Sequence, residues 1–136
     1  MSIHSLWCSA RPILLLGLLA GCDATASAYC TDQFVNVTIT VVDSTGAEVN
    51  DAVITSTLVR TGEVLTPAAT LELFVPGTYV IVDDLARPKL LAGGDTVRVV
   101  ALRGTAAAGT TATYLIDVPG GCHVNKLSGP DTLTVQ

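Results

Sequence analysis

The chain has 136 residues, with seven Lys and Arg against twelve Asp and Glu, which gives a formal net charge of −5 at pH 7. This length suits a single domain. The acidic excess argues against nucleic-acid binding, which needs a basic surface to displace counterions from phosphate. It also argues against electrostatic adhesion to anionic lipid headgroups.

The first 21 residues have the three-part order of a secretory signal peptide. Arg11 supplies positive charge, residues 13–19 form an apolar run, and small residues follow. The apolar run is too short to span a bilayer, which takes about 20 residues. Its composition favours a helix in the precursor, because Leu and Ala are strong helix formers. A buried N-terminal core helix is the alternative, and the order of charged, apolar and small residues argues against it.

The four residues Leu19-Ala20-Gly21-Cys22 resemble the lipobox of bacterial lipoproteins. The resemblance implies cleavage between Gly21 and Cys22, and lipidation of Cys22 as the mature N-terminus. The protein would then be held by Cys22 to a membrane of the bacterial cell envelope, facing the periplasm or the cell exterior. Whether that membrane is the inner or the outer one stays open. A second outcome also stays open, because a cut after Ala28 would release a soluble protein.

The four cysteines fall into two groups once processing is considered. Cys8 leaves with the signal peptide and Cys22 takes lipid, so Cys30 and Cys122 remain. A single pair in an exported chain predicts a disulfide, because the compartment beyond the cytoplasmic membrane can be oxidising. Closing a loop of roughly 90 residues would stabilise the fold by about 4 kcal/mol. A metal site with His123 is the alternative, but paired C-x-x-C spacing is missing.

Cleavage before Cys22 divides the chain into three parts. Residues 1–21 are the signal peptide, residues 22–32 are a small and polar tether, and residues 33–136 form the predicted domain. The chain from Cys22 onward has 115 residues, with six basic against twelve acidic side chains and therefore a charge of −6.

Alternation of apolar and polar residues dominates from residue 33 onward, which is typical of strands with one buried face. Turn-forming residues interrupt the alternation at 43–46 and at Pro76-Gly77. Residues 83–94 are predicted to be a loop with one helical turn, and 104–109 a hairpin tip. The expected strands cover residues 34–41, 52–59, 64–65, 70–74, 78–82, 95–103 and 111–118, with a last, interrupted strand over 122–127 and 131–135. Seven or eight short strands predict an all-β fold, a single antiparallel β-sandwich of immunoglobulin-like or prealbumin-like type.

Two hairpin sequences resemble carboxypeptidase-regulatory-like domains, which are transthyretin-type β-sandwiches. Residues 37–54 are similar to the family's opening hairpin, although Glu48 stands where the family has proline, and residues 75–81 are similar to its Pro-Gly-Thr-Tyr turn. The ending from Gly121 is similar to small lipoproteins that carry such domains. The resemblance implies a folding, adhesion or carbohydrate-contacting module, and it brings no catalytic residue to this chain.

The residues that could carry chemistry are few and scattered. His123 is the single histidine after the signal peptide, and we interpret it as an ordinary strand residue because no nucleophile lies beside it in the sequence. The pair Asp83-Asp84 is predicted to be a solvated turn face, because no calcium-binding D-x-D-x-D-G loop is present. No catalytic residue, metal or cofactor is therefore predicted.

Aromatic residues are also scarce, so a stacking platform for sugars or bases is not indicated. We expect Phe34 and Phe74 to pack in the core or at a sheet edge. Tyr79 is expected to pack its ring and to hydrogen-bond its hydroxyl beside the turn.

The function expected from the sequence is that of a lipid-anchored envelope protein without enzymatic activity. Its β-sandwich would serve a structural role or bind an envelope protein or glycan through its loops. The alternative is an accessory subunit of an envelope assembly that pairs through a free sheet edge. An enzyme is the third possibility.

Overall fold

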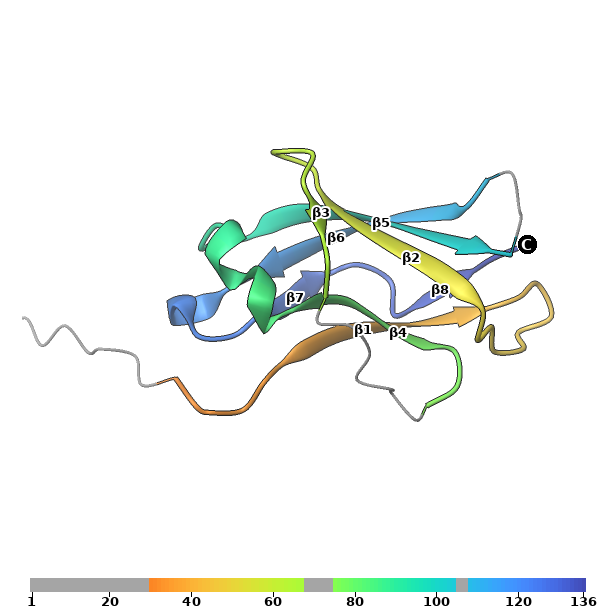
Figure 1. The fold of residues 1–136 in the computed structure, drawn as a ribbon, viewed down its shortest axis with the longest axis horizontal. Helices are drawn as coiled ribbons and strands as arrows, with labels where there is room; N and C mark the ends of the chain where they lie inside the picture. Colours follow the sequence, from red (N-terminus) through yellow and green to blue (C-terminus); the bar gives the residue numbers. More distant parts are fainter. Residues whose placement is uncertain (1–29, 68–74, 105–107) are drawn as a thin grey trace, which may run out of the picture.

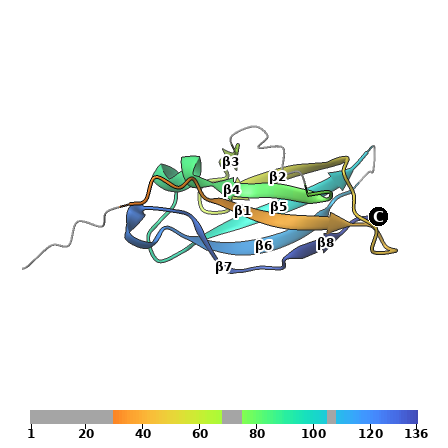
Figure 2. The same cartoon turned by 90° about the horizontal axis from the view of Figure 1, so that it is seen from below.

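A computed structural model describes residues 30–67, 75–104 and 108–136. Their strands form two sheets that pack face to face, so the expected all-β sandwich is confirmed (Figures 1 and 2). The elements are β1 (Asn36–Val42), β2 (Ala52–Leu58), β3 (Val64–Leu65), β4 (Thr78–Asp83), η1 (Asp84–Lys89), β5 (Asp95–Arg103), β6 (Thr110–Asp117), η2 (Pro119–Gly121), β7 (Asn125–Ser128) and β8 (Thr132–Thr134), where η denotes a 3-10 helix. The strand expected at 70–74 lies outside the described residues.

The two sheets have the strand orders β4-β1-β8 and β3-β2-β5-β6-β7. Neighbouring strands are antiparallel except β1 and β8, which run parallel over Thr40–Val42. The expectation of a single interrupted strand at the end of the chain is wrong. Its two halves are β7 and β8, and they belong to different sheets. Between them the chain crosses from one sheet to the other through Gly129. Its φ is 123°, a value that glycine adopts readily and other residues rarely do.

The core lies between the sheets and is built from the inward half of each alternating strand. In β1 every second residue is buried, and β5 repeats this pattern over most of its length. Tyr114 of β6 is the largest fully buried side chain. The core contains Val37, Ile39, Val41, Val49, Leu58, Leu65, Ile81, Val82, Ala86, Leu90, Val97, Val99, Ala101, Tyr114, Ile116, Val118, Val124, Leu133 and Val135.

The two predicted turns lie next to each other in the fold. Asp43 begins the first turn, where its Oδ1 accepts hydrogen bonds from the backbone N–H groups of Thr45 and Ala47. Gly77 forms the second turn with a φ of 69°, and its carbonyl accepts a 2.7 Å hydrogen bond from the N–H of Val41. Tyr79 behaves as expected, because its hydroxyl donates to the Val49 carbonyl at 2.8 Å and accepts from the Ala52 N–H at 2.9 Å.

The sandwich is elongated and has two distinct ends (Figure 1). The described chain begins at one end, where residues 30–35, η1, the turn at 90–94 and η2 gather; we call this the disulfide end. The C-terminus, the loop between β1 and β2, the end of β5 and the start of β6 lie at the opposite end, which we call the far end. The helical turn expected within 83–94 is η1, at the disulfide end.

Candidate functional site

The disulfide end takes its name from Cys30 and Cys122. Their sulfur atoms lie 2.09 Å apart, and their Cα atoms 5.1 Å apart. The predicted pairing is therefore confirmed, and it joins the first described residue to the segment between η2 and β7. The other predicted site residues, Gly21 and Cys22, lie outside the described residues, so cleavage and lipidation there remain predictions.

Asp84 forms the centre of this end, although the sequence indicated a solvated turn. Its side chain is buried, and so is that of the neighbouring Asp83. The carboxylate of Asp84 accepts backbone hydrogen bonds from Val35 at 3.0 Å and from Val124 at 2.9 Å. The expectation was wrong because three segments converge here: the chain before β1, the start of η1 and the chain before β7.

The environment of Asp84 favours its ionised form. Burial alone would raise the pKa of this carboxyl group. The hydrogen bonds from His123, Val124 and Val35 outweigh that effect and hold the pKa below its ordinary value. A buried carboxylate that is fully hydrogen-bonded stabilises the segments that donate to it.

His123 links Asp84 to the start of the described chain, and it is not an ordinary strand residue as expected. It precedes β7, and its Nδ1 lies 2.7 Å from Oδ2 of Asp84. On the other side of the ring, Nε2 lies 2.9 Å from Oγ1 of Thr31. Thr31 and His123 are 92 residues apart, and no spacing in the sequence could reveal that they meet.

Arg87 holds η1 against the segment that contains Cys122. Its Nε donates to the carbonyl of Asp84 at 3.0 Å, and its Nη1 donates to the carbonyl of Cys122. Asp83 caps the start of η1, where its side chain accepts a hydrogen bond from the N–H of Leu85 at 3.0 Å. Side-chain hydrogen bonds and one covalent bond thus fasten the N-terminal segment to the sandwich.

A hollow of about 330 Å³ opens beside this group of residues. Its lining combines the polar residues just described with two apolar side chains, Phe34 and Leu85. Phe34 was expected to pack in the core or at an edge, but 43% of it is exposed, and Leu85 is 58% exposed. The full lining is Thr31, Asp32, Gln33, Phe34, Asp84, Leu85, Arg87 and His123.

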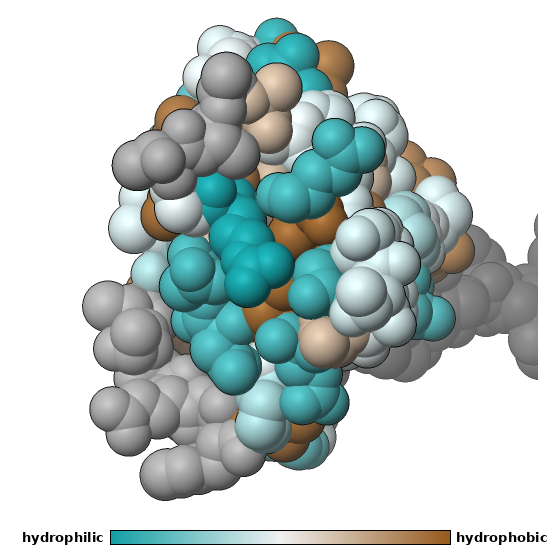
Figure 3. Space-filling model, turned by 90° about the vertical axis from the view of Figure 1, so that its right-hand side faces the viewer, coloured by the Kyte–Doolittle hydropathy of each residue, from teal (hydrophilic) through white to brown (hydrophobic). Residues whose placement is uncertain are grey.

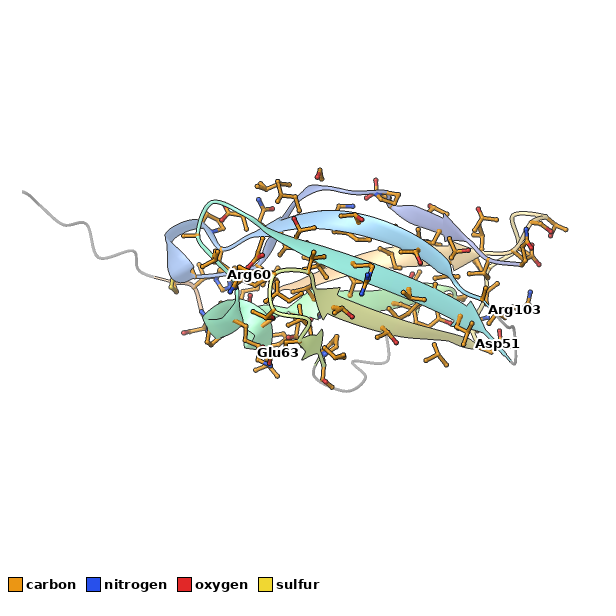
Figure 4. All side chains as sticks on the ribbon, turned by 90° about the horizontal axis from the view of Figure 1, so that it is seen from above. Asp51, Arg60, Glu63 and Arg103 are labelled. Carbon is orange, nitrogen blue, oxygen red and sulfur yellow. A yellow bond between two sulfur atoms is a disulfide. The ribbon has the colours of Figure 1, made fainter. Side chains whose placement is uncertain are left out.

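Ion pairs lie at both ends of the sandwich. Near the disulfide end, Arg60 lies 2.9 Å from the buried carboxylate of Asp95. At the far end, Arg103 lies 3.5 Å from the exposed carboxylate of Asp51 (Figure 4). Hydrophilic residues cover much of the far end, in keeping with a surface in contact with water (Figure 3). An exposed ion pair such as Arg103–Asp51 contributes little to stability.

Thr31, His123 and Asp84 place a hydroxyl, an imidazole and a carboxylate in a row. Nucleophilic hydrolases use the same sequence of groups. The same three groups also tie the N-terminal segment to the domain, and Asp84 receives two backbone N–H groups besides the imidazole. Among residues 30–67, 75–104 and 108–136, no three His, Cys, Asp or Glu side chains gather as metal ligands would.

Comparison with protein-family profiles, with curated proteins and with solved structures found no match for this chain. In the part of the chain that the structure describes, no helix is both long and apolar enough to cross a membrane.

Proposed function

We propose that the protein is a lipoprotein of the bacterial cell envelope whose β-sandwich is a binding or structural module without enzymatic activity. The observation that carries the proposal is the fastening of the N-terminal segment at one end of the domain. Cys30 follows the lipobox-like Cys22 by eight residues and is bonded to Cys122. An anchor attached at Cys22 would therefore hold the sandwich by this end and leave the far loops free to meet a protein or glycan.

The resemblance to carboxypeptidase-regulatory-like domains supports a module of the transthyretin type. The two turns that carry the resemblance are hydrogen-bonded to each other. The N–H of Val41 donates to Gly77, and the N–H of Gly77 donates to the side chain of Asn50 at 2.6 Å. These contacts build a pair of hairpins, so they indicate a module and leave its partner open.

The test is fractionation of bacteria that express the full chain with Cys22→Ser. We expect the wild-type protein in the membrane fraction and the Cys22→Ser protein outside it or unprocessed. Cys8→Ser is the matched control, because that cysteine lies in the signal peptide and should leave membrane attachment unchanged. Wild-type protein that begins at Tyr29 and leaves the membranes in aqueous buffer contradicts the proposal and supports a secreted binding protein.

One specific observation favours a second function, pairing with a partner strand. β8 pairs with β1 at Thr40–Val42 only, and a groove of about 300 Å³ lies between the first half of β1 and the edge strand β7. The N–H of Thr40 points to the β8 side of β1, where it bonds to Asp131. Because strand N–H groups alternate in direction, that of Thr38 points the same way, into the groove.

Thr38→Pro tests this second function, because proline removes the N–H that a partner strand would bond. If strand pairing operates, the variant keeps the disulfide and the β-type circular dichroism but no longer captures its partner from envelope extracts. Substitutions in the far loops, such as Ser44→Arg, are the control. If they abolish capture and Thr38→Pro does not, the partner binds the loops.

A further inference from the structure

We propose that the disulfide end of the sandwich rests directly on the lipid bilayer, with Phe34 and Leu85 inserted into it. The proposal rests on the lipid anchor proposed above and adds the face of the domain that the membrane contacts. Phe34 and Leu85 come from segments about 50 residues apart, yet they line the same hollow. Phe34 is 43% and Leu85 58% exposed, although large apolar side chains are favoured inside a domain or at an interface.

The backbone beneath these two side chains is held in place. Phe34 precedes Val35, whose N–H donates to the side chain of Asp84 and whose carbonyl accepts from the Asp84 N–H at 3.1 Å. The N–H of Leu85 is bonded to the carboxylate of Asp83. The two apolar groups are therefore presented together by one hydrogen-bonded unit, and inserting them would cost little further ordering.

The position of the proposed anchor indicates that this face of the domain meets the bilayer. Cys22 and Cys30 are eight residues apart, so a fully extended connection spans at most about 28 Å. Phe34 lies four residues beyond Cys30. A lipid on Cys22 would thus keep this end within a short distance of the membrane, at an effective concentration on the order of millimolar. Weak insertion of two side chains is sufficient under these conditions.

Partners on its buried carboxylates make this end a suitable one to approach lipid. The carboxylate of Asp84 is hydrogen-bonded to His123 and to two backbone N–H groups, and that of Asp95 forms an ion pair with Arg60. Asp32 is exposed and would lie among the headgroups. The far end exposes Asp51, whose side chain is 66% accessible and lies 3.5 Å from Arg103. An acidic domain is best brought to a bilayer through apolar contacts, because its net charge is repelled by anionic lipids.

The experiment uses tryptophan as a depth reporter. The one tryptophan of the chain, Trp7, precedes Cys22, so a chain that begins at Cys22 has none. Such a chain keeps the whole described core, which begins at Val37. With Cys30 and Cys122 joined in the disulfide, the thiol of Cys22 is the one left for coupling in this chain. A lipid that carries a maleimide group is attached to it. The lipidated protein is bound to phosphatidylcholine vesicles with brominated acyl chains, which quench tryptophan at membrane depth.

Phe34→Trp and Leu85→Trp are the reporters, and Val53→Trp is the matched control, because Val53 is 59% exposed on β2. We expect blue-shifted emission and at least about twofold stronger quenching for the two reporters than for the control. A second variant with Leu85→Asp should return the Phe34→Trp emission to that of water-exposed tryptophan. Equal quenching at all three sites, or none, overturns the proposal. The lipid is attached chemically, so this outcome is independent of whether cells lipidate Cys22.

Discussion

Oδ2 of Asp84 lies 2.7 Å from Nδ1 of His123, and the two residues are 39 positions apart in the sequence. Through this contact the start of η1 is joined to the segment before β7. His123 continues the connection to Thr31, next to Cys30. The hydrogen bonds and the disulfide thus act at one place, where the proposed anchor enters the domain.

Replacing Asp84 by Asn should destabilise the protein in a pH-dependent way. Hydrogen bonds to a charged group contribute about 1.5–3 kcal/mol each, so a loss on the order of 2–3 kcal/mol is expected at pH 7. Because the pKa of Asp84 is lowered in the folded state, its contribution is complete above the ordinary Asp pKa, near 4. The contribution is lost as the pH falls through the lower, folded pKa. Urea unfolding of both proteins between pH 7 and pH 2.5 measures the difference, and a pH-independent difference contradicts this assignment.

Removing the hydroxyl group should affect stability differently at two tyrosines. Tyr79→Phe breaks hydrogen bonds to Val49 and Ala52, so a loss of about 1–2 kcal/mol is expected. The hydroxyl of Tyr114 is buried and has no hydrogen-bond partner among the described residues. Tyr114→Phe should therefore leave the free energy of unfolding at pH 7 unchanged or raise it. Thermal unfolding of both variants gives the comparison, and equal losses would show that the buried hydroxyl is bonded after all.

Tyr114 should also make the fold sensitive to alkali. Burial raises the pKa of its hydroxyl group, and the negative charge of Asp131 adds to this effect. The folded protein therefore keeps its proton above pH 10, where the unfolded chain loses it, and stability falls as the pH rises beyond this value. Tyr114→Phe should retain more stability than the wild type between pH 10 and pH 11.5, as measured by circular dichroism.

Gly129 should tolerate no side chain. A β-carbon at this position would lie 2.3 Å from Cδ1 of Tyr114, and φ is 123°. We expect Gly129→Ala to cost roughly 2 kcal/mol or more, because the buried ring cannot move aside without displacing the core. Gly46→Ala is the matched control, since φ is also positive there but no atom lies within 4 Å. The control should cost about 1 kcal/mol. Equal losses in the two variants would assign the whole effect to φ.

Most strands could be predicted because one of their faces is buried, which imposes alternation directly on the sequence. Residues 36–42 and 95–103 are the clearest cases. The assignment of β7 and β8 to different sheets could not be predicted, because alternation reports which face is buried and carries no information on the neighbouring strand. The parallel pairing of β8 with β1 is a consequence of that crossing.

The candidate site was predictable only where covalent chemistry restricts the choice. Cys30 and Cys122 are the two cysteines that remain if the chain is processed as predicted, so their pairing could be expected. Asp84 and His123 could not be linked, because hydrogen-bonded partners distant in sequence leave no spacing pattern. Phe34 is exposed and Tyr114 is buried, and hydrophobicity alone would suggest the reverse.

Intact-mass analysis of the protein from native membranes, with and without reduction, reports the start of the mature chain, its lipid and its disulfide together. We predict a chain that begins at Cys22 and carries the added mass of acyl groups. We also predict a gain of two hydrogen masses on reduction, from opening the Cys30–Cys122 bond. A mature chain that begins at Tyr29, or that begins at Cys22 without lipid, contradicts the proposed anchoring.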